Sequence, residues 1–166
     1  FPDRPPHGMP LRALSLTQAS ECGVVYSPRE VADLCAAARA RGLKVHMDGA
    51  RFANAVAAQG CAPADLTWRA GVDVLSFGAT KNGGVAAEAV IFFNPADAQD
   101  FMFRRKRGGH LFSKSRFIAA QFNALFENGL WLELARRANA AAARLSEGLV
   151  GAGARLWRPT QANAVF

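Results

Sequence analysis

A single lysine, Lys81, stands in a run of small residues, SFGATKNGG, between two apolar segments. These segments, 72–75 and 85–93, predict two buried strands joined by the small-residue loop. Glycine and alanine let backbone and ligand approach closely, and a poorly solvated amine in such a loop is a better nucleophile toward an aldehyde. Taken alone, however, the loop favours the simpler interpretation of a turn whose lysine points into water.

A second motif upstream, KVHMDGAR, changes this balance. Residues 43–47 predict a short buried strand, and Asp48 follows at its carboxyl end, where open α/β sheets bind ligands. An aspartate there can keep a pyridine nitrogen protonated, while Lys81 can hold the aldehyde carbon of the same ring. The two residues therefore predict a pyridoxal 5'-phosphate site, with a Schiff base on the lysine and the charged ring as electron sink. Arg51, in the first turn of a predicted helix, is better explained by this site than by a surface salt bridge.

Two longer segments, HMDGARFANAV and SFGATKNGGVAAEAVIFF, resemble the signature segments of the low-specificity L-threonine aldolases. That group belongs to the beta-eliminating lyases, within the pyridoxal phosphate enzymes of fold type I, which resemble aspartate aminotransferase. The resemblance covers the chain from about residue 14 onward, including 17–26, 106–117 and Asn139. It implies an α/β fold, in which a mostly parallel sheet with flanking helices forms part of the large cofactor-binding domain.

The resemblance also implies a division of the chain. Residues 1–128 would form the C-terminal part of the large domain that binds pyridoxal phosphate. Residues 129–166 would form the interdomain helix and the start of the small domain. Threonine aldolases are considerably longer than 166 residues, so we expect this chain to be a fragment of a longer one.

The activity implied by the resemblance is that of an aldehyde-lyase, the aldol cleavage of L-threonine or L-allo-threonine to glycine and an aldehyde. Another pyridoxal phosphate reaction, by a different lyase or a racemase, is the alternative, because the cofactor carries the chemistry in all of them. A further alternative is a non-catalytic fragment that lacks the upstream phosphate-binding loop. The implied partners are an amino acid substrate and further copies of the chain, in a homodimer or homotetramer.

The site residues are assigned by matching the family motifs position by position. Lys81 and Asp48 are the catalytic candidates, and both also bind the cofactor. Arg51 and Thr80 complete the cofactor-binding set. Thr80 could bind the phosphate or merely cap the turn, and the sequence leaves both interpretations open.

The candidates for substrate binding are Arg51, Ser20, Glu21, Lys106 and Arg116. Arg51 would help to bind the substrate carboxylate. Some relatives carry a histidine near positions 20 and 21, thought to assist at the substrate hydroxyl, so the serine and glutamate here leave the general base open. A solvated turn explains Glu21 equally well. Lys106 and Arg116 belong to a basic cluster that is partly a solvated helix face and partly a phosphate or carboxylate site, including contacts across a subunit interface.

Two polar residues inside predicted strands have structural explanations. His46 stands two residues before Asp48, so strand alternation points both side chains to the same face. We interpret His46 as a packed residue or a supporting partner of the site, and not as a catalytic base. Glu88 lies in an apolar run and would be costly to bury alone, so we expect an arginine partner for it.

The composition is that of a globular protein. Hydrophobic residues make up 51% of the chain, yet no window holds the ~18 uninterrupted apolar residues of a membrane span. The 3 cysteines are odd in number and lack metal-ligand spacing, which predicts free thiols in the cytoplasm and no metal site. The net charge of +7 is accompanied by neither a stacking platform nor a nucleic-acid motif, so we expect no nucleic-acid partner.

Strands and helices alternate along the chain. Strands are predicted at 11–16, 43–47, 72–77 and 85–93, with a further strand at the C-terminal end. Helices are predicted at 28–41, 51–59, 62–70, 94–107, 114–127 and 131–150. Because a strand, a helix and a strand follow one another at the start, the first two strands should be parallel.

Overall fold

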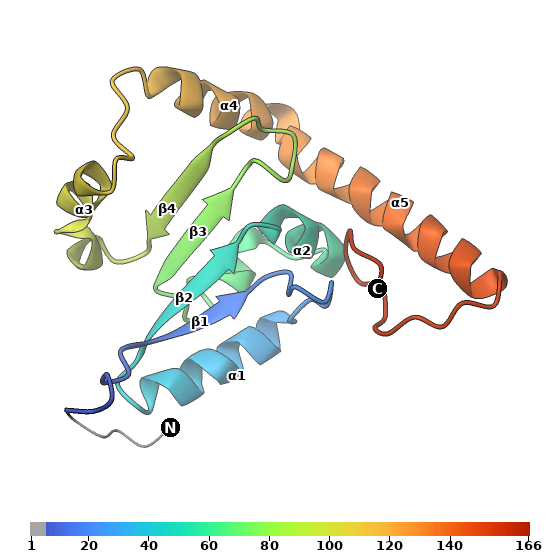
Figure 1. Ribbon diagram of the computed structural model, residues 1–166, viewed down its shortest axis with the longest axis horizontal. Coiled ribbons are helices and arrows are strands. Elements are labelled where there is room, and N and C mark those ends of the chain that lie inside the picture. Colours follow the sequence, from blue (N-terminus) through green and yellow to red (C-terminus); the bar gives the residue numbers. More distant parts are fainter. Residues whose placement is uncertain (1–5) are drawn as a thin grey trace.

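A four-stranded mixed sheet forms the centre of the structure, a computed structural model that describes residues 6–166 (Figure 1). Its strands are β1 (Ala13–Thr17), β2 (Lys44–Gly49), β3 (Val74–Gly78) and β4 (Glu88–Phe92), which lie in this order across the sheet. The first three strands run parallel, while β4 runs antiparallel to β3. The predicted α/β class with a mostly parallel sheet and flanking helices is therefore confirmed.

The crossover from β1 to β2 is made by α1 (Pro28–Arg39), as the alternation of elements predicts. Ser27 caps this helix, because its hydroxyl accepts the Glu30 amide at 3.3 Å while the Glu30 carboxylate accepts the Ser27 amide at 2.8 Å. Hydrogen bonds to the Glu30 carboxylate from the Ser27 amide and, at 2.8 Å, from the Ser27 hydroxyl hold the pKa of Glu30 below its ordinary value. On the inner side of the helix, Val31 and Cys35 are fully buried, which places this cysteine in the core.

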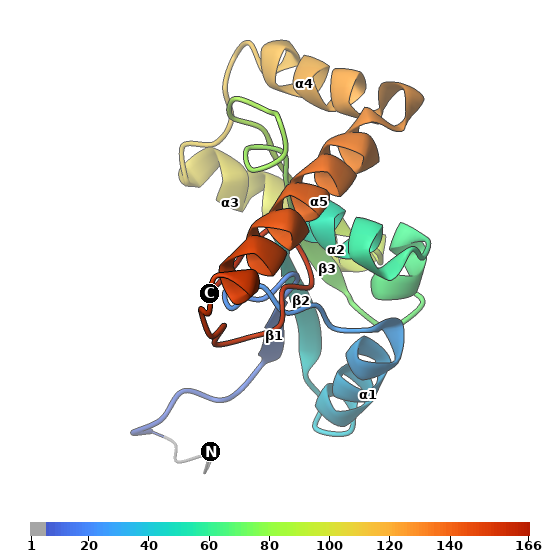
Figure 2. The same ribbon diagram turned by 90° about the vertical axis from the view of Figure 1, so that its right-hand side faces the viewer.

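Alternation along the parallel strands produces one apolar and one polar face. The apolar face carries the buried side chains of Leu16, Val45, Met47, Leu75 and Phe77. α1 and α2 (Phe52–Gln59) pack on this face and lie on the same side of the sheet (Figure 2). The polar face carries Ser15, Thr17, His46, Asp48 and Ser76. The candidate site therefore lies on the polar face, where the strands end.

Three further helices follow the sheet: α3 (Phe101–Arg107), α4 (Arg116–Phe126) and α5 (Leu130–Gly151). α5 packs across α2, and the small side chains of Ala135 and Ala142 are buried along it. Among the described helices, none combines the length and the hydropathy that a membrane crossing requires.

Two predicted helices are shorter than the sequence pattern indicates. The helix predicted at 62–70 is only a 3-10 turn, Pro63–Leu66, because Thr67 leaves the helical region with φ −126° and ψ −111°. The helix predicted at 94–107 is split into a 3-10 turn, Pro95–Ala98, and the helix α3.

The predicted strand at the C-terminal end is not formed in the described part of the chain. Residues 154–166 follow an irregular path back to the loop after β1. There the Gln161 carboxamide oxygen accepts the Val25 amide at 2.8 Å. A single side-chain contact of this kind satisfies the loop without adding a strand to the sheet.

A cluster of aromatic rings joins the end of β3 to three helices. Phe77 lies 6.2 Å from Phe52 of α2, 5.9 Å from Phe122 and 5.8 Å from Phe126 of α4, and 5.8 Å from Trp131 of α5, measured between ring centroids. Aromatic pairs at these distances contribute about 0.5–1.5 kcal/mol beyond their buried area. The strand that leads to Lys81 is thus held by α4 and α5 as well as by its own sheet.

Candidate active site

The ends of the three parallel strands bring Thr17, Asp48 and Ser76 to one level of the sheet. Thr17 pairs with Asp48 in the register of β1 and β2, and Asp48 pairs with Ser76 in the register of β2 and β3. This carboxyl edge is where open α/β sheets bind ligands. Asp48 therefore lies in the middle of the edge at which a ligand is expected.

Asp48 is half-buried and is fixed by its neighbours through backbone contacts. Its Oδ1 accepts the Ala50 amide at 3.0 Å, and its main-chain oxygen accepts the Gln18 amide at 2.9 Å. Within residues 6–166, the second carboxylate oxygen forms no hydrogen bond and no salt bridge. One oxygen thus shapes the turn, and the other can still accept a proton donor.

Arg51 occupies the position just before α2, where the chain turns from strand to helix. Its carbonyl accepts the amides of Asn54 at 3.0 Å and Ala55 at 3.2 Å, so its backbone begins the helix. The side chain is half-buried, and its guanidinium pairs with no carboxylate in the described part of the chain. A cation without a structural partner at this edge suits an anionic ligand.

Lys81 lies in the turn between β3 and β4, and its side chain is exposed. The Ala79 amide donates to the Ala87 carbonyl at 2.9 Å, while the Ala79 carbonyl accepts the amides of Asn82 at 2.9 Å and Gly84 at 3.0 Å. These hydrogen bonds close a tight turn around Ala79. The expectation of a poorly solvated lysine is wrong for this chain by itself, because the Lys81 side chain is exposed.

Thr80, next to Lys81, donates its hydroxyl to Glu88 Oε1 at 2.9 Å. The same carboxylate lies over Gly78, where an added Cβ would stand 2.7 Å from Glu88 Oε2. The expected arginine partner of Glu88 is therefore wrong, since this exposed carboxylate is held by a hydroxyl. A negative charge beside Thr80 would repel a phosphate, which favours the turn-capping interpretation. Phosphate binding by Thr80 stays a prediction.

His46 bridges two serines across the polar face. Its Nδ1 lies 2.8 Å from Ser15 Oγ, and its Nε2 lies 2.9 Å from Ser76 Oγ. Because Ser76 pairs with Asp48, this row of hydrogen bonds reaches the edge of the sheet. Both ring nitrogens already have partners, which supports the interpretation of His46 as a supporting residue.

The loop after β1 holds Ser20 and Glu21 beyond the end of that strand. Ser20 closes a turn, because its amide donates to the Val24 carbonyl at 2.9 Å and its hydroxyl accepts the Val24 amide at 3.1 Å. Gln18 is fully buried and fixes the loop through two hydrogen bonds to Tyr26. Its Nε2 donates to the Tyr26 carbonyl at 2.7 Å, and its Oε1 accepts the Tyr26 amide at 3.1 Å. Glu21 is exposed on this rigid loop.

Comparison with known proteins assigns this arrangement to a family. The profile of the family described as Beta-eliminating lyase matches residues 2–166. The chain belongs to the beta-eliminating lyase family.

Curated relatives of this chain confirm the resemblance to threonine aldolases. The chain is 49% identical over 156 residues to a curated low specificity L-threonine aldolase from Pseudomonas sp. (strain NCIMB 10558). It is 48% identical over 156 residues to a protein of the same name from Pseudomonas aeruginosa. Each alignment covers 93% of the chain and 45% of the relative, so the chain spans about half the length of the curated relatives it matches.

Solved structures with the same fold include the threonine aldolase of Leishmania major. It matches with a TM-score of 0.91 and 32% identity, over 98% of this chain and 48% of that one. A putative aromatic amino acid beta-eliminating lyase/threonine aldolase from Exiguobacterium sp. 255-15 matches with a TM-score of 0.72 over 91% of this chain and 43% of its own. At 22% identity, this second likeness supports the fold alone.

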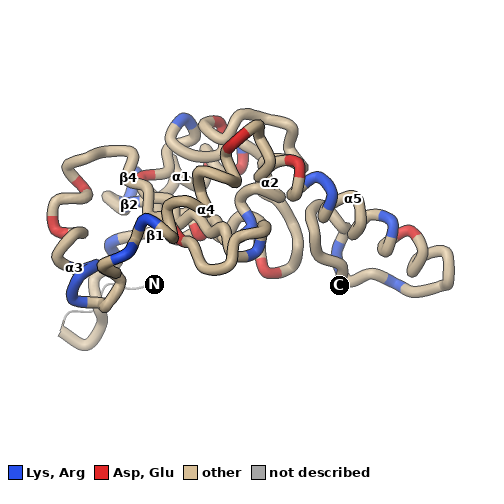
Figure 3. Tube along the Cα trace, turned by 90° about the horizontal axis from the view of Figure 1, so that it is seen from above, with Lys and Arg blue, Asp and Glu red and all other residues tan. Residues whose placement is uncertain are grey.

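Within residues 6–166, Lys106 and Arg116 form no hydrogen bond and no salt bridge with the residues of the edge that carries Asp48. Lys106 lies on α3, whose basic residues gather at one end of the molecule (Figure 3). α3 follows β4, and Phe92 of β4 pairs with Val74 at the amino end of β3, so this helix lies beyond the opposite end of the sheet (Figure 1). Arg116 begins α4 and stacks on the neighbouring Phe117 ring at 4.9 Å. Their contacts across a subunit interface stay a prediction.

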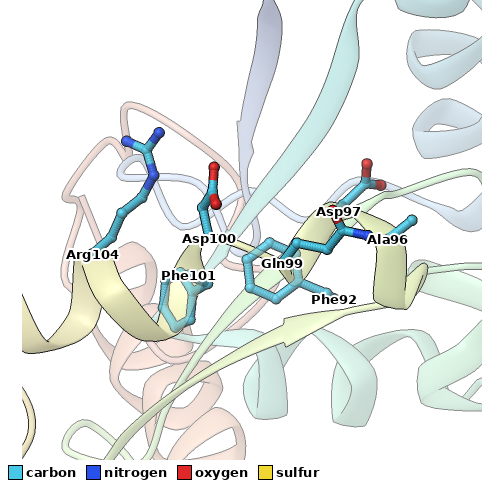
Figure 4. A pocket seen from close by; sticks show the side chains of 7 residues that line it. All are labelled: Phe92, Ala96, Asp97, Gln99, Asp100, Phe101 and Arg104. Atoms are coloured by element: carbon cyan, nitrogen blue, oxygen red, sulfur yellow. The ribbon is translucent and has the colours of Figure 1, made fainter.

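A pocket of about 320 Å³ lies between β4 and α3 (Figure 4). Its walls include two acidic residues, one arginine and two aromatic rings: Asp97, Asp100, Arg104, Phe92 and Phe101. The pocket lies at the amino end of the parallel strands, where the register places Phe92. It is therefore separate from the edge at which a ligand is expected.

The sequence patterns did not predict a set of amide side chains that hydrogen-bond segments around the site: Gln18, Asn54, Asn82 and Gln121. Asn54 is 1% exposed and donates to Asn139 Oδ1 at 3.1 Å, while Asn139 donates to the Asn54 carbonyl at 3.0 Å. An amide in the apolar run FANAV is a signal that could have revealed Asn54. Its partner is not readable, because the two residues are far apart in the sequence.

Proposed function

We propose that the full-length protein carrying this sequence is a pyridoxal phosphate-dependent threonine aldolase, which cleaves L-threonine, L-allo-threonine and related β-hydroxy-α-amino acids to glycine and an aldehyde. One observation carries the proposal. Asp48 ends β2, and the Lys81 turn leaves the same end of the adjacent strand β3. The 49% identity to a curated low specificity L-threonine aldolase supports this activity over other reactions of the same cofactor.

The groups available at this edge fit the cofactor. The pyridine nitrogen needs an acidic partner, and Asp48 keeps one carboxylate oxygen without a hydrogen bond among the described residues. The aldehyde needs a primary amine, and Lys81 is exposed and forms no ion pair within residues 6–166. A carboxylate and an amine from adjacent strands thus match the two ends of one ring.

Each site residue would act on a particular atom of the cofactor or of the substrate. Lys81 Nζ would hold the aldehyde carbon of the cofactor. Asp48 would keep the proton on the pyridine nitrogen, and Arg51 would pair with the substrate carboxylate and so orient the Cα–Cβ bond that is cleaved. When bound, pyridoxal phosphate supplies an electron sink for the pair released from that bond.

The β-hydroxyl of the substrate also needs a proton acceptor. Of the two residues on the loop after β1, Ser20 already uses its hydroxyl oxygen to accept the Val24 amide. Glu21 is exposed, and its carboxylate has no salt bridge in the described part of the chain. Glu21 is therefore the candidate that we propose for the acceptor, with Ser20 holding the loop.

The proposal also includes the oligomeric state and the cellular location of the protein. In a homodimer or homotetramer, Lys106 or Arg116 of one copy would reach the strand ends of another and bind a phosphate or carboxylate there. A cytoplasmic location, expected from the free cysteines, stays a prediction beside it.

Substitution of Lys81 tests the proposal directly. In Lys81→Ala, release of acetaldehyde and glycine from L-threonine should fall by at least about a thousandfold, because the activated amine is lost. The matched control is Lys114→Ala, which removes an exposed lysine from the loop before α4 and should keep wild-type activity. Sustained turnover by Lys81→Ala would refute the assignment.

Covalent trapping gives a second test that does not depend on turnover. Borohydride reduction of the protein with pyridoxal phosphate should leave a pyridoxyl group on the peptide that contains Lys81, detected by mass spectrometry. A label on a different lysine would contradict the site. Pyruvate from a substrate with a β-leaving group, or D-allo-threonine from L-threonine by inversion at Cα, in place of glycine would identify elimination or racemisation instead.

A further inference from the structure

The turn that carries Lys81 is tied to two helices that come later in the chain. Asn82 Nδ2 donates to the main-chain oxygen of Trp131, in the first turn of α5, at 2.8 Å. From α4, Gln121 Oε1 accepts two successive amides of the same turn, Val85 at 2.8 Å and Ala86 at 3.2 Å. The hydrogen bond from Asn82 lies directly after Lys81 in the sequence, and the two accepted by Gln121 lie shortly before β4.

Close packing accompanies these ties. Gly83 has φ +98°, and an added Cβ there would stand 2.9 Å from Leu134 Cδ1 of α5. Beneath the turn, Ala79, Ala87 and Leu125 are buried and form a small core of their own. At Gly83 the turn therefore packs against α5 with no room for a larger side chain, and its buried alanines pack with Leu125 of α4.

The two ties lie on opposite sides of the joint between α4 and α5. At this joint, Asn128 has φ 52° and Gly129 has φ 73°, so the chain changes direction through two left-handed residues. Gln121 lies before the joint and Trp131 after it. Any change in the angle between the two helices therefore acts on the Lys81 turn (Figure 1).

We propose that Asn82 and Gln121 are positioning residues for Lys81, which hold its amine in place by fastening the turn to α5 and α4. They touch neither substrate nor cofactor in this role and act through the backbone on either side of the lysine. The effect on catalysis rests on the function proposed above for Lys81. This fastening, the attachment of the Lys81 turn to α4 and α5 by Gln121 and Asn82, can be measured independently of that function.

The two amides have opposite roles in their hydrogen bonds, which makes the inference specific. Toward the turn, Gln121 acts as an acceptor, so Gln121→Glu keeps an oxygen in place for both amides and loses only the long hydrogen bond, 3.4 Å, from Gln121 Nε2 to the Phe117 carbonyl within α4. Asn82 acts as a donor, so Asn82→Asp sets a carboxylate against the carbonyl of Trp131. Two isosteric changes from amide to acid should therefore give opposite results.

Hydrogen exchange of residues 82–87, followed by mass spectrometry on the full-length protein, tests the fastening. Asn82→Ala, Asn82→Asp and Gln121→Ala should each speed exchange in this segment by about tenfold, the effect of losing about 1.4 kcal/mol of protection. Gln121→Glu should exchange like the wild type. The matched control is Asn123→Asp, which makes the same change at an exposed position on α4 and should alter nothing.

Kinetics on the same variants test the positioning. In Asn82→Asp, kcat for L-threonine should fall by about ten- to a hundredfold while KM changes less, because the lysine is displaced and Arg51 is not. Gln121→Glu should restore the kcat that Gln121→Ala loses, which a general loss of stability would not produce.

Specific outcomes would overturn the inference. Unchanged exchange in Asn82→Asp and Gln121→Ala would show that the turn is not fastened by these amides. Faster exchange with unchanged kcat would show that the fastening does not position Lys81. Absence of a pyridoxyl label on Lys81 in the wild type would instead refute the proposed function, and the exchange pattern would still decide whether the turn is fastened.

Discussion

The two ends of the parallel strands differ in how their charged residues are partnered. At the amino end, Lys44 Nζ lies 2.9 Å from Asp97 Oδ2 and 3.5 Å from Asp73 Oδ1. The second oxygen of Asp73 accepts the Val45 amide at 2.8 Å, so this carboxylate also closes the backbone between β2 and β3. Each charged group of this network has a structural partner.

At the carboxyl end, the charged residues Asp48, Arg51 and Lys81 form no salt bridge in the described part of the chain. Among the described residues, Asp48 accepts one backbone amide and keeps its other carboxylate oxygen without a partner. The contrast shows which charges maintain the fold and which are available to a ligand. A pocket lies near the paired end, but the unpaired charges lie at the other end.

The largest effect should come from exchanging one carboxylate at each end for its amide. Asp48→Asn should lower threonine cleavage by about a hundredfold or more, because an amide cannot stabilise a protonated pyridine nitrogen. Asp97→Asn should leave activity unchanged and lower Tm by at most about 2 °C, since its pair with Lys44 is partly solvated. Equal losses of activity in the two variants would contradict the distinction between a carboxyl end that binds ligands and an amino end that maintains the fold.

A smaller effect, on stability alone, is expected from Asp73→Ala. The Asp73 side chain is only 15% exposed, and its removal leaves the Val45 amide without that acceptor. The free energy of unfolding should fall by about 1–3 kcal/mol, measured by urea denaturation. Threonine cleavage per folded molecule should stay near the wild-type value, and a large loss of kcat would place Asp73 in the site instead.

The smallest effect should appear in alkaline solution. The hydrogen bond to Asp97 raises the pKa of Lys44 above its ordinary 10.5, so the folded state holds this proton more tightly than the unfolded chain does. The pair therefore stabilises the fold fully below that ordinary value, and the stabilisation is lost as the pH rises through the raised pKa. The Tm difference between wild type and Asp97→Asn should be constant near neutral pH and vanish in strong alkali, and a difference that grows with pH would contradict the pairing.

Local sequence patterns predicted which helices and strands form better than they predicted the residues at which these elements begin and end. The helix α1 and the parallel strands β1 and β2 follow the sequence closely, because capping and hydrophobic periodicity act within a few residues. The helix predicted at 62–70 stops early, since Thr67 adopts a backbone conformation that its neighbours do not reveal. The predicted partner of Glu88 was wrong because burial was inferred from neighbouring residues, whereas the side chain is exposed beside Thr80.

The sequence by itself determined the family resemblance, the α/β class and the candidates Asp48 and Lys81, because these depend on residue type, order and short-range pattern. Only the tertiary structure decided that Asp48 lies beside Ser76 in the register of β2 and β3. It also decided that Asn82 hydrogen-bonds to α5 and that Gln121 of α4 hydrogen-bonds to the Lys81 turn. The physical reason is that a hydrogen bond between distant segments depends on how helices cross and strands align. Those arrangements follow from the packing of the whole core, which no short stretch of sequence contains.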